Sequence, residues 1–577
     1  MSSVLGCGVW AIRINSANIE VVFLAVFITA FLFAGLGAFE NSLSHDVPLG
    51  YYASDAFFHA AEAQNMADQG RVKYASPAVV GKNTDVIDIH PPMLFEASAL
   101  LMKISGLTGY DAVYFMSVLF LLLISLVMYL LIRDFNKSAA ILSLPFTLLV
   151  FTSPFNQMMT LGQFLFIAGA LFMVAMLWSF RHIKEKKMWI TLSFFAAATA
   201  IAHQPELAYA ALFILLFLAF KLAKKEFEMS TIKKLFMSGL LAVALAAYSL
   251  RIFMMSWVEG GTGATLGFTT DAGVVGRGFS EIGFSTIGQN IYGGIFGLII
   301  SAAIIILIAA GALFALAKAK NRSYASAVGL FGVAISFLIY IGLEKRAFAH
   351  RWLWYVYLSV FIGAGIYALL NKAVKWKTIY SIAAAAILLI MLFPAVNGKI
   401  RGSAMDPYNW EALEWVSSSV EEDATVHYFY VGSLEQSSML YFSKRMARLV
   451  VYDYYIDALN TGKIYRNYSF GLAYGYVQYV CERSPLQFGY YEYYEKQENQ
   501  GCLKEFPGTL KGELQENTDI CGIRYYYFNK AGRIEPLVQY NMAIRDILLK
   551  KDWINEVYSN PVVSILKNNK PGAECIG

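Results

Sequence analysis

Three ionisable residues, Asp55, His59 and Glu62, follow one another at positions i, i+4 and i+7 of the segment 54–70. This spacing places all three side chains on the same side of a helix. Asp55 falls in the first turn, where the helix dipole stabilises an ionised carboxylate. A charged carboxylate with a fixed direction is suited to accept a proton, so Asp55 is a candidate general base. The same acidic first turn is also typical of a surface helix whose carboxylates only complement the dipole.

The segment 54–70 carries signals for both ends of a helix. Ser54 is a good N-cap residue, and Gly70 is a good residue to follow the last turn. Small and apolar residues repeat at helical spacing and form one stripe, namely Ala56, Ala60, Ala63, Met66 and Ala67. We therefore predict a short helix that lies on a membrane surface.

The composition is that of a polytopic membrane protein. Of the 577 residues, 57% are hydrophobic and 15% are charged, whereas a soluble globular domain carries roughly 25% charged residues. Apolar runs of about 17–25 residues are long enough to cross a bilayer. Such runs, some short or broken, lie near 19–38, 111–132, 138–156, 161–180, 189–202, 206–220, 235–257, 290–317, 325–343, 352–370 and 378–396. The sequence thus predicts a mainly α-helical membrane domain over 1–396 with about eleven transmembrane helices.

The distribution of Lys and Arg predicts the orientation of these spans. The loops between alternate spans are strongly basic, which is typical of the cytoplasmic side; they are 133–137, 181–187, 221–234, 318–322 and 372–377. The loops on the other side are 39–92, 156–162, 203–206, 258–289 and 344–351, and apart from the basic cluster in 344–351 they contain few Lys or Arg residues. We expect a cytoplasmic N-terminus, and an odd number of spans then places 397–577 outside.

The segment 397–577 is expected to form a separate outward-facing domain. Strand-like runs such as 425–431 alternate with helical runs such as 409–418, which indicates a mixed α/β fold. Its four cysteines, an even number, fit two disulfides whose pairing is open; they are Cys481, Cys502, Cys521 and Cys575. A zinc site is not favoured because the paired Cys-x-x-Cys spacing is missing.

Further polar residues gather on the outward side. Carboxylates and histidines come from the loop 39–92, and a basic cluster comes from 344–351. A carboxylate base opposite arginines suits a reaction that deprotonates a hydroxyl group and releases a phosphate. Besides Asp55, His59 and Glu62, the candidates are Asp88, His90, Gln163, His203, Glu206, Arg277, Arg346, His350 and Arg351. Ionisable residues at span ends also serve as simple anchors at the membrane surface, and the Asp55, His59 and Glu62 spacing is compatible with a divalent metal such as Mg or Mn.

Several short motifs together resemble those of the GT-C superfamily of membrane glycosyltransferases. They are Asp55-Ala56-Phe57-Phe58-His59 in a helix closed by Gly70, then His90-Pro91-Pro92, Leu161-Gly162-Gln163-Phe164, Arg351 at the outer end of a span, and Trp410-Glu411-Ala412-Leu413-Glu414-Trp415. The likeness extends over the whole architecture, with the membrane domain followed by a soluble one.

The resemblance implies an inverting transfer of a sugar from a polyprenyl-phosphate or polyprenyl-pyrophosphate donor to a protein, glycan or lipid acceptor on the outer membrane face. In that scheme Asp55 is the general base. The donor phosphate is bound by Arg351, with Arg346, His350 and Arg277 as further candidates. His59 and His90 line the acceptor or sugar pocket, and the other substrate-binding candidates are Glu62, Asp88, Gln163, His203 and Glu206.

The sequence also departs from particular branches of this superfamily. The outward loop 155–160 has no acidic residue, and the tail lacks the Trp-Trp-Asp-Tyr-Gly motif of oligosaccharyltransferases. Metal-dependent transfer of a whole oligosaccharide to Asn is therefore not favoured, and sugar and acceptor stay open. Two other functions also stay open: a transporter or lipid flippase, and a non-catalytic relative that acts in binding at the cell envelope. The hydropathy pattern has no internal repeat, which argues against the transporter.

Overall fold

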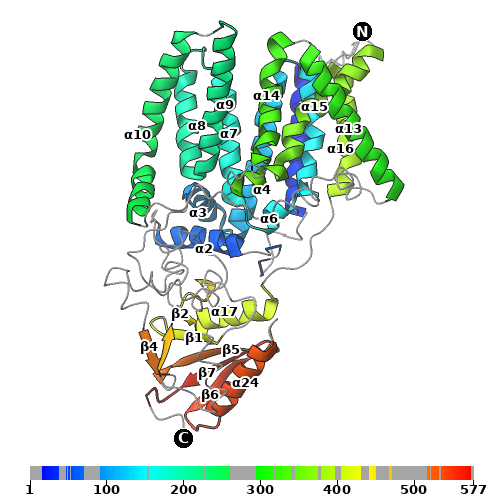
Figure 1. Cartoon of the computed structure of the whole chain (residues 1–577). Helices are drawn as coiled ribbons and strands as arrows, with labels where there is room; N and C mark the ends of the chain where they lie inside the picture. Colours follow the sequence, from blue (N-terminus) through cyan, green and yellow to red (C-terminus); the bar gives the residue numbers. More distant parts are fainter. Residues whose placement is uncertain are drawn as a thin grey trace, which may run out of the picture.

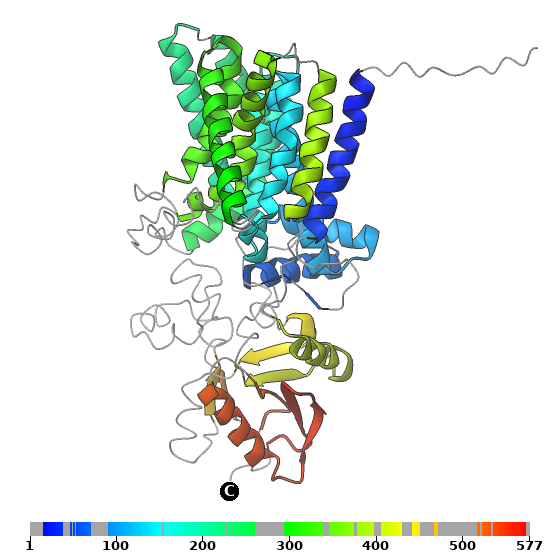
Figure 2. The ribbon, with the colours of Figure 1, turned by 90° about the vertical axis from the view of Figure 1, so that its right-hand side faces the viewer.

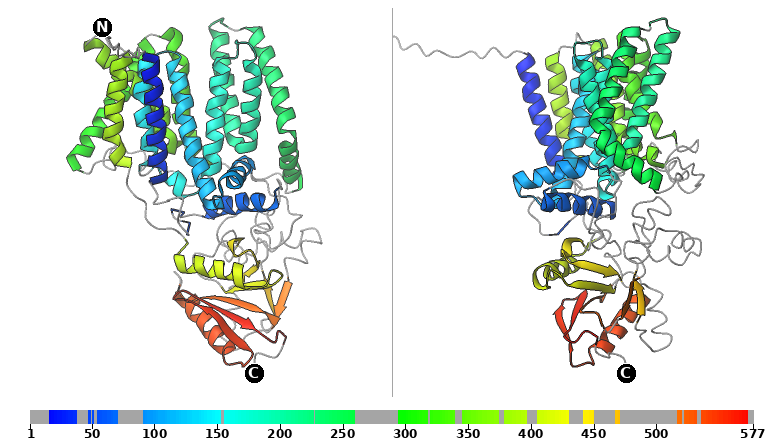
Figure 3. Two further views of the ribbon diagram at one scale, coloured as in Figure 1. Left: turned by 180° about the vertical axis from the view of Figure 1, so that it is seen from behind. Right: turned by 90° about the vertical axis from the view of Figure 1, so that its left-hand side faces the viewer.

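The computed structural model shows a bundle of long helices and a smaller domain with a β-sheet, with two short helices between them (Figure 1). The two parts lie one beyond the other along the bundle axis in both side views (Figures 2 and 3). The structure describes residues 16–37, 47–48, 50–51, 54–70, 91–152, 155–226, 228–259, 294–317, 319–338, 345–373, 378–396, 405–429, 441–449, 467–470, 516–519, 522–531 and 535–572.

Every apolar run predicted to span the membrane coincides with a helix of the bundle. The helices are α1 (Ser16–Gly37), α4 (Gly109–Arg133), α5 (Lys137–Thr147) continued by the 3₁₀ turn η1 (Leu148–Phe151), α7 (Phe164–Arg181), α8 (Met188–Ala202), α9 (Gln204–Ala223), α10 (Met229–Glu259), α13 (Gly294–Ala317), α14 (Ala319–Ile335), α15 (Trp354–Ala373) and α16 (Thr378–Val396). Within the described residues, six helices are long and apolar enough to cross a membrane, and five others are shorter apolar helices. The chain is therefore an integral membrane protein, and the number of eleven spans stays a prediction.

Local sequence signals explain where several of these helices begin. Thr108 caps α4, because its hydroxyl accepts a hydrogen bond from the Asp111 backbone N–H at 3.3 Å. Asn136 caps α5 in the same way through Ala139 at 2.8 Å. His203 has an extended backbone between α8 and α9, and Pro205 occupies the first turn of α9. The predicted tight turn between two spans at 203–206 is thus confirmed.

Three of the predicted basic loops meet at one end of the bundle. His182 lies 2.8 Å from Asp134, which joins the loop after α7 to the loop after α4. Lys234 of α10 donates a hydrogen bond to the Ile183 carbonyl oxygen at 2.8 Å. At the start of α1, Glu20 forms an ion pair with Arg133 at 3.1 Å and another with Lys137. The N-terminal end of α1 therefore lies on the same side of the bundle as these basic loops.

Two short helices lie at the opposite end of the bundle, α2 (Ser54–Gln69) and α3 (Met93–Ser105) (Figure 1). The helix α2 matches the helix expected at 54–70, and Gly70 has the positive φ of +64° that ends many helices. The expectation that α2 lies on a membrane surface with one polar face is wrong in one respect. Its polar residues His59 and Glu62 are as deeply buried as its alanines, because α3 and α4 pack against the helix and the Gly162 turn lies against its first turn.

The C-terminal domain has a five-stranded mixed sheet with the strand order β2-β1-β5-β7-β6. Its strands are β1 (Thr425–Phe429), β2 (Met446–Leu449), β5 (Tyr525–Asn529), β6 (Ile554–Ser559) and β7 (Val563–Asn568). β1 runs parallel to β2 and β5, whereas β7 is antiparallel to β5 and β6. A separate two-stranded sheet pairs β3 (Asn467–Phe470) with β4 (Glu516–Asp519). The predicted mixed α/β domain is confirmed. The four predicted disulfide cysteines lie outside the described residues.

Two helices cover the five-stranded sheet. The helix α17 (Pro407–Ser419) places Leu413 and Val416 in the same apolar core as Tyr428 and Tyr527 of the sheet. The helix α24 (Glu535–Leu548) belongs to a second core with Tyr526 and Phe528. Successive β5 residues thus alternate between the two cores, as the pleat of a strand requires.

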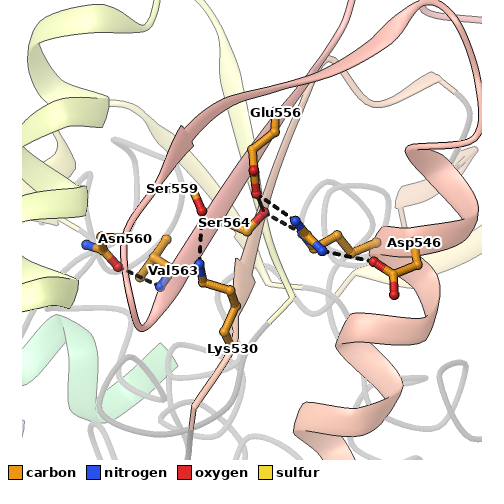
Figure 4. Close-up of polar contacts among 8 residues, drawn as sticks. Lys530, Asp546, Glu556, Ser559, Asn560, Val563 and Ser564 are labelled. Atoms are coloured by element: carbon orange, nitrogen blue, oxygen red, sulfur yellow. Dashed lines mark hydrogen bonds and ion pairs between the residues drawn. The ribbon is translucent and has the colours of Figure 1, made fainter.

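Polar side chains fasten α24 to the β6–β7 hairpin. Arg545 donates to Glu556 at 2.9 Å and to Ser564 at 2.7 Å, and Ser564 donates to the same Glu556 carboxylate. At the hairpin turn, Asn560 accepts from the Val563 N–H at 2.7 Å (Figure 4). These contacts join elements of the sheet domain to one another. Other residues attach the sheet domain to the bundle.

The sheet domain contacts the bundle through an aromatic pair. The ring of Trp410 in α17 meets the ring of Tyr110 in α4 edge to face, with centroids 5.7 Å apart. The same helix carries Trp415, whose ring lies 5.1 Å from Tyr558 inside the sheet domain. One tryptophan of α17 therefore joins the two domains, and the other stabilises its own domain.

We predict that Trp410→Ala increases hydrogen exchange at the first turn of α4, whereas Trp415→Ala does not. An aromatic pair contributes about 0.5–1.5 kcal/mol beyond its buried area, so exchange should rise by up to about tenfold. Hydrogen exchange followed by mass spectrometry measures both variants. Equal exchange at residues 109–112 in the two variants would contradict the assignment of Trp410 to the domain contact.

Candidate functional site

The predicted general base Asp55 lies against the turn that precedes α7. The Gln163 side-chain amide donates a hydrogen bond to Asp55 Oδ2 at 3.4 Å. Gly162 has a φ of +71°, and a Cβ atom on it would lie 2.7 Å from Ala56 Cα and 2.8 Å from the Asp55 carbonyl carbon. Only glycine combines this backbone conformation with such a close approach. The Gly-Gln pair recognised in the sequence therefore touches the base directly, one residue by its backbone and the other by its side chain.

A buried tyrosine supports the same contact from behind. The Tyr51 ring lies 5.4 Å from Phe57, two residues after Asp55, and 5.9 Å from Phe164, the residue after Gln163. Its hydroxyl donates to the Tyr110 carbonyl oxygen at 2.5 Å. Burial raises the pKa of the Tyr51 phenol, and the nearby Asp111 carboxylate raises it further, so the hydroxyl stays protonated and keeps this hydrogen bond. Tyr51 thus binds together the two segments that carry Asp55 and Gln163.

Two other polar residues of α2, His59 and Glu62, are inside the protein. The His59 ring lies among Phe58, Phe95 and Phe164, with centroids 5.5–6.0 Å apart. Glu62, one turn further along, is also buried. The side of α2 predicted to carry Asp55, His59 and Glu62 therefore packs through His59 against Phe95 of α3 and Phe164 of α7.

The predicted phosphate-binding residue Arg351 belongs to the 3₁₀ helix η3 (Lys345–Leu353). Its guanidinium group stacks on the ring of Phe348 at 3.8 Å and on that of Trp352 at 4.2 Å. It also donates to the Phe348 carbonyl oxygen at 3.0 Å. Arg351 is partly exposed, so this charged group lies at the surface of η3 on an aromatic support.

The first turn of α7 contacts both the base and the arginine segment. Gln163 reaches Asp55, while Phe166 lies 5.0 Å from the His350 ring and 6.5 Å from the Trp352 ring. His350 and Trp352 are the two neighbours of Arg351 in the chain. Residues that are far apart in the sequence thus gather around one helix end, with the carboxylate and the arginine supplied by different segments.

Three further candidates form a buried cluster of their own. The Glu206 carboxylate contacts His203 Nδ1 through one oxygen and His350 Nε2 through the other, the latter at 3.3 Å. His350 Nδ1 lies 3.0 Å from the Tyr357 hydroxyl. Glu206 is 1% exposed and His350 0%. The sequence suggests that His203 and Glu206 bind the substrate and that His350 binds the donor phosphate, whereas in the structure these three side chains contact one another.

The remaining candidates are placed as follows. Asp88, His90 and Arg277 lie outside the described residues, and Arg346 is described only by its backbone in η3. In the part of the chain that the structure describes, no group of three His, Cys, Asp or Glu residues could hold a metal ion.

Several residues of the site carry no signal in the sequence. Tyr51, Phe166 and Tyr357 are ordinary aromatic residues of apolar or loop segments, and their importance comes from partners distant in the chain. The close approach of Gly162 to α2 has no signal in the sequence apart from the Gly-Gln motif itself.

The comparisons with known proteins concern the fold. A family model described as dolichyl-phosphate-mannose-protein mannosyltransferase matches residues 89–256, which include the Gly162–Gln163 turn. The fold is similar to the oligosaccharyltransferase of Archaeoglobus fulgidus in the apo form, with 13% identity, 92% of this chain and 73% of that chain covered, and a TM-score of 0.51. It is also similar to ArnT from Cupriavidus metallidurans in the apo state, with 11% identity, 96% and 98% of the two chains covered, and a TM-score of 0.52.

The chain has the GT-C fold. The fold is also similar to the structure of the same ArnT bound to undecaprenyl phosphate. The identity is 11%, 98% of this chain and 100% of that chain are covered, and the TM-score is 0.51. A search among curated protein sequences gives no match. The resemblance drawn from short motifs is therefore confirmed at the level of the GT-C fold, over nearly the whole chain.

We predict that Gly162→Ala separates the first turn of α2 from the turn before α7 while the bundle stays folded. The added Cβ would clash with the backbone of Asp55 and Ala56, and a non-glycine residue at this φ is itself strained by about 1–2 kcal/mol. The melting temperature should fall by several degrees, and hydrogen exchange should become faster at residues 54–60. As a control, Gly239→Ala in α10 adds a methyl group where no atom lies within 4 Å. A Gly162→Ala protein with the stability and exchange of this control would contradict the proposed contact.

Proposed function

We propose that this protein is an inverting glycosyltransferase that moves a sugar from a polyprenyl-phosphate donor to an acceptor on the outer membrane face. The observation that carries the proposal is the first turn of α7, which contacts Asp55 through Gln163 and the segment around Arg351 through Phe166. A carboxylate and an arginine supplied from two sides suit the two halves of a displacement at a sugar carbon. The GT-C fold shared with ArnT, which is known bound to undecaprenyl phosphate, supports a lipid-linked donor.

The charges of Asp55 and Arg351 assign each of them a role in the reaction. Asp55 accepts the proton of the acceptor hydroxyl as its oxygen attacks the anomeric carbon of the donor sugar. The bond from that carbon to the phosphate oxygen breaks, and its electron pair leaves with the polyprenyl phosphate. Arg351 stabilises the negative charge of the departing phosphate. Attack opposite the leaving group inverts the configuration at the anomeric carbon.

The neighbouring residues have supporting roles in this scheme. The Gln163 amide donates to one Asp55 oxygen and so helps to fix the direction of the carboxylate. His59 is held behind Asp55 by three aromatic rings and shapes the wall of the sugar or acceptor pocket. Glu62, Asp88 and His90 stay candidates for the same pocket. Arg346 and Arg277 stay candidates for a second contact to the phosphate.

The proposed orientation places this site outside the cytoplasm. Three basic loops and the start of α1 share one end of the bundle, and α2 lies at the other end. Because basic loops are typically cytoplasmic, the N-terminus is cytoplasmic and the site at α2 faces outward. In this arrangement 1–396 is the catalytic membrane domain, and 397–577 is an extracytoplasmic domain next to the acceptor side.

We predict that Asp55→Asn abolishes sugar transfer and leaves the fold intact. Loss of a general base typically costs about 10²–10⁴-fold in rate. The measurement is transfer from a polyprenyl-phosphate sugar by purified protein in liposomes. Asp68→Asn serves as the matched control, because Asp68 is an exposed carboxylate on the same helix and should keep full activity. Equal transfer by both variants would move the base to another carboxylate such as Asp85, Asp88 or Glu206.

We predict that Arg351→Ala weakens the use of the donor more than the chemical step. Removing the charged partner of a buried phosphate typically costs about 2–5 kcal/mol, so KM for the donor should rise at least about thirtyfold. Arg351→Lys should recover part of this loss, because lysine keeps the charge without the planar fork. Unchanged donor affinity in Arg351→Ala would assign the phosphate to Arg346, Arg277 or Arg251 instead.

A further inference from the structure

The 3₁₀ helix η3 is unusually long for its kind. It extends over 9 residues, Lys345–Leu353, whereas 3₁₀ segments longer than about 3–4 residues are uncommon because their hydrogen bonds are poorly aligned. A segment of this length needs contacts with the rest of the protein to keep its shape. Those contacts decide the direction in which Arg351 points.

The side chains of η3 form ridges because residues i and i+3 are eclipsed in a 3₁₀ helix. Ala347, His350 and Leu353 form the inner ridge, and each is 0% exposed. Phe348 and Arg351 form the next ridge and stack on one another. The direction of Arg351 is therefore set by the rotation of η3 about its axis. His350 is the polar member of the inner ridge, and an apolar ridge alone would fix that rotation less sharply.

Both ring nitrogens of His350 have partners in the protein interior. Nε2 lies 3.3 Å from Glu206 Oε1, and Nδ1 lies 3.0 Å from the Tyr357 hydroxyl. A neutral imidazole has one donor and one acceptor nitrogen. The Tyr357 hydroxyl is within hydrogen-bond distance of Nδ1, whereas Nε2 contacts the Glu206 carboxylate without an aligned hydrogen bond. The rings of Phe166 and Tyr209 enclose the imidazole at 5.0 and 5.4 Å.

Glu206 connects His350 to the turn between α8 and α9. Its second oxygen bonds His203 Nδ1, and α7 makes room for the pair at Gly169. A Cβ atom there would lie 2.6 Å from His203 Cβ and 2.8 Å from Glu206 Oε2. A buried carboxylate is costly, and apolar side chains of similar size often give equal or greater stability. Buried polar groups of this kind are best known for enforcing one geometry.

We propose that Glu206 is a positioning residue for the donor-phosphate site. Held by His203 and the α8–α9 turn, Glu206 fixes His350, and with Tyr357 it sets the rotation of η3 and the direction of Arg351. This assignment replaces the substrate-binding roles expected from sequence for His203 and Glu206, and the phosphate-binding role expected for His350. It rests on the proposed function, because Arg351 is the proposed contact to the polyprenyl phosphate.

The test compares two single-atom changes of buried tyrosines. Tyr357→Phe removes the hydroxyl bound to His350. Tyr114→Phe removes a hydroxyl that donates to the Gly35 carbonyl oxygen at 2.7 Å, far from η3 in the chain, and Tyr114 is as buried as Tyr357. Glu206→Gln is the third variant, since it keeps the shape of the side chain and removes its charge. The measurements are binding of undecaprenyl phosphate, KM and kcat for a polyprenyl-phosphate sugar, and hydrogen exchange of residues 347–353.

The expected result separates the first two variants. Loss of a buried hydrogen bond costs about 0.5–1.5 kcal/mol, so Tyr357→Phe should bind undecaprenyl phosphate about 3–10-fold more weakly, with KM raised and kcat nearly unchanged. Its exchange in η3 should increase. Glu206→Gln should show a larger effect of the same kind. Tyr114→Phe should lose similar thermal stability and keep both the affinity and the η3 exchange of the wild type.

Two outcomes would overturn the proposal. In one, Tyr357→Phe binds undecaprenyl phosphate as tightly as Tyr114→Phe does. In the other, η3 exchanges equally fast in both. Both comparisons use Tyr357→Phe and remain decisive if Glu206→Gln fails to fold. Failure of the proposed function has a different signature: the wild type itself then neither binds undecaprenyl phosphate nor transfers a sugar, while exchange in η3 still distinguishes the tyrosine variants.

Discussion

The close approach of the Gly162 turn to the first turn of α2 is the contact on which the site depends. It brings backbone against backbone, and the space holds no side chain larger than a hydrogen atom. A contact of this kind fixes the position of Asp55 more sharply than side-chain packing does, because backbones have no rotamers to change. Tyr51 then closes the arrangement from behind with its ring and its hydroxyl. The Asp55 carboxylate thus stands on a rigid support, as precise chemistry requires.

The two charged groups of the site are held in different ways. Asp55 is supported by the close approach of Gly162 and by the Gln163 amide. Arg351 lies on aromatic rings at the surface of a 3₁₀ helix whose inner side carries a buried polar cluster. The first turn of α7 separates the two and touches both segments. Such a division suits a site where a proton is taken on one side and a phosphate departs on the other.

The sequence predicts the features that depend on local patterns. Hydropathy locates the bundle helices, and capping and glycine signals locate α2. The Gly162–Gln163 motif was recognised by resemblance, and the structure supplies its physical reason. The sequence could not show that α2 is buried on both faces. It also could not show that His203, Glu206 and His350 bind one another, because polar residues at span ends look alike whether they face substrate, lipid headgroups or each other. Which of these partners a polar residue faces depends on contacts between distant segments of the chain. A single sequence does not show those contacts.

The most direct test of the account is the stereochemistry of the product made by the wild-type protein in liposomes, from a panel of polyprenyl-phosphate sugars with defined anomeric configuration. Nuclear magnetic resonance of the isolated product gives the configuration at the anomeric carbon. The account predicts transfer from at least one donor, with that configuration inverted, since Asp55 activates the acceptor directly and forms no covalent intermediate. A product that retains the donor configuration, or folded protein that transfers no sugar from any donor, would contradict it.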